Sequence, residues 1–141
     1  MPEGLNVRLR DVLKTLAEQM ASELDADACA ISRVLGDVLI LVAECVHDGS
    51  TLQLGQGYLV PDFPTTAAVL ATGKPSAFTV DDPGVDPAEA MILRDLGYAS
   101  LVMAPLLMSG GTWGLVEVYR RDVRAFTDDD VRRALELSRV D

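Results

Sequence analysis

The sequence predicts an α+β fold: a mainly antiparallel sheet of five or six strands with helices on both faces. Strand-like segments occur in consecutive pairs, 28–34 with 37–46 and 99–107 with 112–120, and a short turn joins each pair. Such pairs cannot be βαβ units, because parallel strands need a long crossover connection. Helical segments precede, separate and follow the pairs, which is the α+β pattern.

The chain is expected to begin and end with a helix. Residues 5–24 carry an apolar stripe at three- and four-residue steps, and residues 128–139 follow the N-cap signal of Thr127 and three aspartates. The first stripe is long for a helix that packs only on its own sheet, so both stripes are candidates for pairing with a second copy of the chain. The candidate dimer residues are Val12, Leu16, Met20, Leu135 and Leu137. The alternative is that both stripes only cover their own sheet.

The middle of the chain predicts two short helices and one further strand. Pro64 and Gly73 bound the first helix, over residues 64–72. Asp86, with Pro87 and Glu89 behind it, predicts a capped helix that stops at Gly97. The strand lies at 75–80, and the glycine-rich stretch 47–63 is predicted to be irregular.

The last strand, within "GGTWGLVEVY" (110–119), opens with glycines around the only tryptophan. A phosphate-binding loop would need its glycines before a helix, so these glycines are interpreted as scaffold. Gly114 is predicted to let another backbone or a ring lie close to the strand. By alternation, Trp113, Leu115 and Glu117 share one face, and Gly114, Val116 and Val118 share the other. Pro105 on the preceding strand predicts an edge or a bulge there.

Composition narrows the function. The 141 residues suffice for one domain, and a net charge of −10 argues against nucleic acid and anionic membranes as partners. No apolar run is long enough to span a membrane and no signal peptide is apparent, so a cytoplasmic protein is expected. His47, Cys29 and Cys45 form no metal-binding pattern. The cysteines are expected to be reduced, and the hairpin brings them near each other without deciding whether they share a face.

Three segments resemble a known family. They are the helix-to-strand opening "LAEQMASELDADACAISRV", the helix-to-strand segment "TTAAVLATGKPSAF", and the close "LRDLGYASLVMAPLLMSGGTWGLVEVYRRDVRAFTDDDVRRALELS". Their order along nearly the whole chain is similar to that of the GAF domain, a sensory module of signalling proteins. The PAS domain, which shares the profilin-like architecture, is the structural alternative, but it normally lacks the long first helix and this ending.

The resemblance implies that the first and last helices lie together on one face and that the other face holds a ligand cavity. It also implies dimerisation through the terminal helices. GAF domains are usually linked to an output domain such as a histidine kinase, a diguanylate cyclase or a phosphatase. The chain contains none of these, so it is expected to be a fragment of a larger signalling protein.

The candidate cavity is described by two sets of residues, although the alternative for each residue is an ordinary core or surface position. The apolar set is Leu54, Tyr58, Phe63, Val69, Phe78, Met91, Ile92, Met103 and Val116. The polar anchors, of the kind that ligand pockets use sparingly, are Tyr58, Thr79, Arg94 and Ser100.

Known ligand signatures of the family are missing. There is no chromophore-attachment cysteine in the helix–loop region and no Asn-Lys-Phe-Asp-Glu run for a cyclic nucleotide. Asp86 and Glu89 would repel a phosphate at their helix. The expected function is therefore a non-enzymatic regulatory module with an unknown small ligand and no identified cofactor or metal. The alternatives are a ligand-free dimerisation or spacer module and, less favoured because both cysteines lie on strands, a methionine sulfoxide reductase.

Overall fold

The computed structural model describes residues 3–52 and 55–140, with side chains from residue 8 onward. It confirms the α+β prediction and the mainly antiparallel sheet. The elements follow in the order α1 (Glu3–Glu23), β1 (Ala28–Leu35), β2 (Val38–Val46), β3 (Gly57–Leu59), a 3₁₀ turn (Val60–Asp62), α2 (Pro64–Thr72), β4 (Ser76–Thr79), α3 (Pro87–Asp95), β5 (Ser100–Met108), β6 (Gly111–Arg120), α4 (Asp128–Leu137) and β7 (Arg139–Val140).

The sheet runs in the order β3-β2-β1-β6-β5-β4, and every pair along this path is antiparallel. The short strand β7 adds a parallel pair to β5 at Leu107 and Met108. Pro105 therefore lies where the outer edge of β5 passes from β4 to β7, and the register with β6 shifts just after it, between Leu106 and Leu107. A proline is tolerated at such a position, because no ladder there needs its missing N–H.

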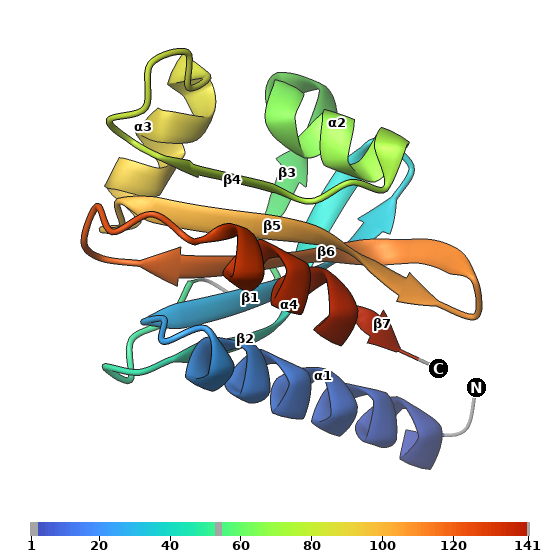
Figure 1. Ribbon diagram of the computed structural model, residues 1–141. Coiled ribbons are helices and arrows are strands. Elements are labelled where there is room, and N and C mark those ends of the chain that lie inside the picture. Colours follow the sequence, from blue (N-terminus) through green and yellow to red (C-terminus); the bar gives the residue numbers. More distant parts are fainter. Residues whose placement is uncertain (1–2, 53–54, 141) are drawn as a thin grey trace.

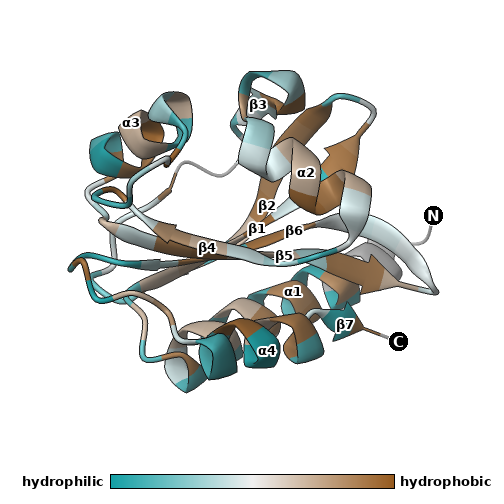
Figure 2. Cartoon of the chain, turned by 45° about the horizontal axis from the view of Figure 1, so that its top comes forward, coloured by the Kyte–Doolittle hydropathy of each residue, from teal (hydrophilic) through white to brown (hydrophobic). Residues whose placement is uncertain are grey.

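Two helical layers cover the sheet (Figure 1). Helices α1 and α4 lie on one face, and α2 and α3 lie on the other, as Figure 2 shows from a second direction. Each face has its own core: Met20, Leu24 and Val118 belong to the α1/α4 side, whereas Leu93, Leu101 and Leu115 belong to the α2/α3 side. The arrangement expected from the resemblance, with the terminal helices together, is confirmed.

Local signals set most element ends. Gly73 ends α2 in the left-handed conformation at φ 73°, and Asp86 caps α3 by accepting from the N–H of Glu89. Thr127 and Asp130 form a complete capping box at α4. The prediction that 47–63 is wholly irregular was wrong, because the three-residue strand β3 pairs with β2 there.

Strand β6 corrects one prediction about its faces. Gly114 pairs with Leu106 and Thr112 with Leu107, so Trp113 is an extra residue that forms a bulge in β6. The bulge breaks the alternation, and Trp113 packs against the α1/α4 core instead of joining Leu115. Beyond it, the predicted alternation of faces holds.

The two cysteines lie directly opposite each other in the β1–β2 ladder, Cys29 against Cys45. Both belong to the α1/α4 side of the sheet, and both are free thiols. Burial raises the pKa of each thiol, and most strongly that of Cys29, so the reactive thiolate form is disfavoured.

Candidate ligand-binding site

A cavity of about 60 Å³ lies between the sheet and the α2/α3 layer. Its lining is apolar apart from a few polar side chains. The lining residues are Ala30, Ser32, Leu39, Leu41, Leu52, Tyr58, Phe63, Thr66, Glu89, Ile92, Leu93, Leu96, Leu101, Met103, Glu117 and Tyr119. An apolar pocket with few polar groups is the usual form of a small-molecule site.

The floor of this cavity is a row across the three central strands. Ala30 of β1 pairs with Glu117 of β6, which pairs with Met103 of β5. Cross-strand partners share a face of the sheet, so all three point toward α2 and α3. Ala30 leaves the space beside Glu117 open, because its side chain is a single methyl group.

The cover of the cavity is held by a contact between its two helices. The Oε1 atom of Glu89 on α3 accepts hydrogen bonds from the Thr66 N–H (2.9 Å) and the Thr66 hydroxyl (2.7 Å), in the first turn of α2. Phe63 at the N-cap of α2 offers no side-chain cap, so Glu89 performs that role from another helix. The sequence predicts a local capping role for Glu89, but its carboxylate turns inward to Thr66 instead.

The second oxygen of Glu89, Oε2, is buried and has no hydrogen-bond partner among the described residues. The residue is only 3% exposed. A buried carboxylate oxygen without a donor is unfavourable by about 1–3 kcal/mol, and more when it carries charge. Because Glu89 lines the cavity, the site includes an acceptor that no described residue satisfies.

Glu117 is the second acidic group of the cavity. Its pKa is raised to about 7: burial is the largest cause, a hydrogen bond with the Tyr119 side chain lowers the pKa, and the nearby charge of Glu89 raises it. Glu117 also raises the pKa of Tyr58, whose burial is the larger cause. A carboxyl group that titrates near neutrality is typical of functional sites.

We expect the Glu117→Gln variant to be more stable than the wild type at pH 8 and equally stable below about pH 4.5. The folded pKa of Glu117 lies above its unfolded value, so its stabilising protonated state is lost as the pH rises from 4.5 through 7. The difference at pH 8 is up to about 3 kcal/mol. Urea unfolding at both pH values measures it, and a pH-independent difference would contradict the assignment.

Four of the predicted pocket residues reach the cavity: Tyr58, Phe63, Ile92 and Met103. Tyr58 and Phe63 form an edge-to-face ring pair with centroids 6.1 Å apart. Val69 is buried in the core of the same face and Phe78 packs against that core, but neither lines the cavity. Leu54 lies outside the described residues.

The other predicted pocket residues lie elsewhere. Thr79 bonds to the Asp82 carboxylate, Ser100 donates to the Asp122 carbonyl, and Arg94 donates to the Val80 carbonyl. Met91 is 62% exposed on the outer side of α3. Val116 belongs to the core beneath α1 and α4, on the opposite face of the sheet, since it alternates with Glu117.

Sequence reasoning missed Glu89, Glu117, Thr66 and Tyr119 as pocket residues. The sequence did contain a signal for Glu117. Acidic side chains are seldom buried, so a glutamate between Leu115 and Tyr119 on a central strand indicates a specific role. Glu89 had none, since an acid in the first turn of a helix is expected for capping alone.

The predicted dimer residues divide into two groups. Leu16 and Met20 are buried in the core of their own sheet, and Leu137 packs on that core. Leu135 is half-buried, while Val12 is 47% exposed and borders a shallow groove with Leu16, Gln19 and Val140.

The described residues lack two further features, a membrane-spanning helix and a metal-binding cluster. No described helix is long and apolar enough to cross a bilayer. No three His, Cys, Asp or Glu side chains within the described ranges are grouped so that they could hold a metal ion.

Comparison with known proteins assigns the class. The model of the GAF domain family matches residues 8–139, so the chain belongs to the GAF domain family. A search of curated proteins found no match.

Similar solved structures include GAF domains and a chromophore-binding domain. The GAF domain of PixJ from Thermosynechococcus elongatus, in its blue-light absorbing form, is 22% identical with a TM-score of 0.79, over 94% of this chain and 82% of that one. A phycocyanobilin-bound GAF domain from a cyanobacterial phytochrome is 21% identical with a TM-score of 0.76, over 95% and 84%.

A third structure is the chromophore-binding domain of a Stigmatella aurantiaca bacteriophytochrome (Thr289His mutant). It is 17% identical with a TM-score of 0.75, over 92% of this chain. The present chain spans only 51% of that structure. At these identities the likeness establishes the fold.

Proposed function

We propose that this GAF domain is a sensory module that binds a small molecule in the cavity beneath α2 and α3. Occupancy would be relayed through α1 and α4 to a linked output domain such as a histidine kinase, a diguanylate cyclase or a phosphatase. The observation that carries the proposal is the cavity itself. It is a mostly apolar pocket lined by Glu89, whose Oε2 atom has no hydrogen-bond donor among the described residues.

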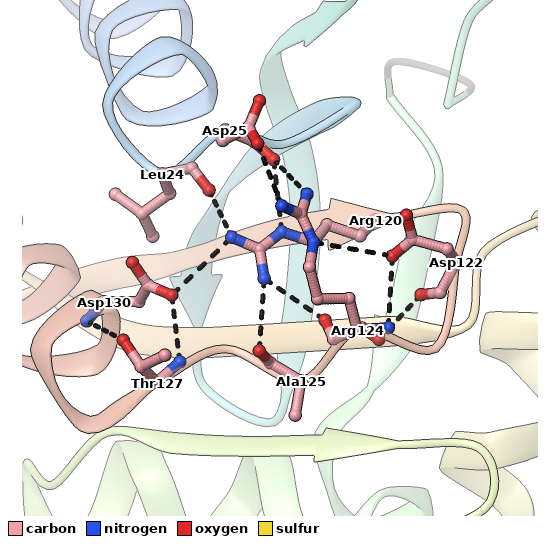
Figure 3. A network of polar contacts seen from close by, with 9 residues as sticks. Leu24, Asp25, Arg120, Asp122, Arg124, Ala125, Thr127 and Asp130 are labelled. Carbon is pink, nitrogen blue, oxygen red and sulfur yellow. Dashed lines mark hydrogen bonds and ion pairs between the residues drawn. The ribbon is translucent and has the colours of Figure 1, made fainter.

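Strand β6 offers a physical route between the two faces. Glu117 and Tyr119 face the cavity, and the next residue, Arg120, points to the other side. Its guanidinium donates to the carbonyls of Leu24 (2.6 Å) and Asp25 (3.1 Å) after α1, and to that of Ala125 (3.2 Å) before α4 (Figure 3). A ligand that shifts β6 would therefore act on one end of each terminal helix.

The cavity constrains the ligand. Its volume of about 60 Å³ is well below the roughly 300–1,000 Å³ of typical ligand pockets. The α2/α3 cover must therefore move outward to admit anything larger than a few atoms. Several of the similar solved structures are phycocyanobilin-bound, phycoerythrobilin-bound or chromophore-binding domains. In this chain the cysteines lie on the opposite face of the sheet from the cavity, which does not support covalent attachment of a chromophore there.

The test is a thermal-shift screen of a metabolite panel on the wild type and on the Ala30→Leu variant. Leucine adds three carbon atoms beside Glu117, into space that already exists, so this variant should fold and lose binding. A compound that raises the melting temperature of the wild type alone supports the proposal. Equal shifts in both proteins would place the binding site elsewhere.

The groove beside α1 favours a second candidate, a homodimerisation or spacer module. The groove is lined by Asp11, Val12, Thr15, Leu16, Gln19, Leu137, Arg139 and Val140. Val12 is its exposed apolar residue, and we expect Val12→Glu to weaken a dimer at least tenfold. Sedimentation at tens of micromolar measures this effect, with Val123→Glu, another exposed valine, as the control. A monomeric wild type would rule out the dimer.

A further inference from the structure

We propose that the cavity takes an organic cation, whose protonated amine or guanidinium lies between the carboxyl groups of Glu89 and Glu117. The inference rests on the proposed function and names the ligand's chemical class. It follows from the polar groups that face the cavity and from the apolar surface around them.

Glu89 provides the first half of the argument. Its Oε1 atom is fully engaged by the two Thr66 donors, which fix the orientation of the carboxylate. With that orientation set, Oε2 cannot turn to find a donor elsewhere, and no described residue supplies one. The unmet requirement at this buried atom is for a hydrogen-bond donor, and a charged donor satisfies a carboxylate best.

Glu117 provides the second half. It lies near enough to Glu89 for the two like charges to interact, and it also interacts with Tyr58 and Tyr119. Glu44 of β2, in the same cross-strand row, is already occupied by the Leu52 N–H and the Thr51 hydroxyl. None of the described lining residues is Lys, Arg or His, so the chain brings no cation of its own to this pair.

The rest of the lining decides between classes of cation. The lining disfavours a metal ion because it is mostly apolar and offers few oxygen ligands, and the described residues include no group of three metal-binding side chains. Leu93, Leu101 and Met103 are apolar, and the Tyr58–Phe63 ring pair offers π-faces that attract organic cations. An anion such as a phosphate or carboxylate would meet two acids and no base.

The experiment compares three probes of similar shape: 2-phenylethylamine, 2-phenylethanol and 3-phenylpropionate. Isothermal titration at pH 8 measures each against the wild type, Glu89→Gln, Glu117→Gln and Ala30→Leu. Glutamine keeps the acceptor that holds Thr66, so the Glu89→Gln fold should survive. Glu18→Gln, on the exposed side of α1, is the matched control for loss of one negative charge.

We expect the amine to bind at least tenfold more tightly than the alcohol, and the carboxylate not to bind. Each pocket glutamine variant should weaken the amine at least tenfold and leave the alcohol unchanged, and Glu18→Gln should change neither. The proposal of a cationic ligand would be overturned by any of three results: equal binding of the amine and the alcohol, preferred binding of the carboxylate, or no binding of any probe. If the alcohol binds as well as the amine and only Ala30→Leu abolishes its binding, the cavity is the binding site but its ligand need not be a cation. Amine binding that survives Ala30→Leu would overturn the site itself.

Discussion

The Arg120→Met variant is expected to lose about 3–5 kcal/mol of unfolding free energy, one of the two largest effects that the structure predicts. Arg120 is only 4% exposed. Its guanidinium satisfies the carbonyls of Leu24, Asp25 and Ala125, and its carbon CZ lies 4.0 Å from the centroid of the Phe126 ring. Methionine keeps much of the side-chain volume but removes the side-chain donor of the Leu24 and Ala125 carbonyls, whereas the Asp25 carbonyl keeps a bond from Arg124 at 3.3 Å.

The neighbouring Arg124→Met variant is the control for this prediction. Arg124 also contacts Asp25, at 3.0 Å, but its side chain is 55% exposed, and exposed ion pairs contribute little. Urea denaturation of both variants measures the difference, and we expect Arg124→Met to change stability by less than about 1 kcal/mol. Similar losses in the two variants would show that the buried network does not hold the helix ends.

Gly114→Ala is expected to destabilise the fold by about 3 kcal/mol, with little folded protein at 37 °C if the strands cannot separate. A Cβ atom on Gly114 would overlap the carbonyl oxygen of Ser32 on β1 and lie 3.2 Å from the Cα of Arg33. Both groups are backbone of a central strand pair, so neither can move without disturbing the β1–β6 ladder. The backbone of Gly114 is not in the left-handed region, so a side chain there would not strain the backbone. The obstacle to a Cβ atom is instead its overlap with β1.

Gly111→Ala on the same strand is the matched control for Gly114→Ala. The nearest atom to a Cβ there is the Met108 carbonyl oxygen at 4.0 Å, an ordinary contact. Thermal unfolding followed by circular dichroism should show a large drop in melting temperature for Gly114→Ala and almost none for Gly111→Ala. Equal melting temperatures would contradict the close approach of β1 and β6.

Most of the fold was predictable because local signals specify it. Proline at the first turn and glycine after the last set the bounds of α2, and a side-chain cap begins α4. The elements that escaped prediction, β3 and β7, have three and two residues. Strands so short show no alternation of apolar and polar residues. They form because the edge of a longer strand, β2 or β5, provides backbone hydrogen-bond partners.

The site was less predictable, because its key groups come together through tertiary contacts. Alternation along β6 correctly separated Glu117 from Val116, yet it could not say which face would receive α2 and α3. The inward turn of Glu89 depends on Thr66, 23 positions away in the chain. Nothing local to either residue reveals the contact.

Native mass spectrometry of the wild type and of Ala30→Leu, both produced in the native host, tests the central claim most directly. The claim is that the cavity over Ala30 and Glu117 holds a small molecule. It predicts a wild-type species heavier than the mass of the chain by one small, non-covalent ligand, and an Ala30→Leu species at the mass of the chain alone. The same adduct on both proteins, or on neither, would contradict it.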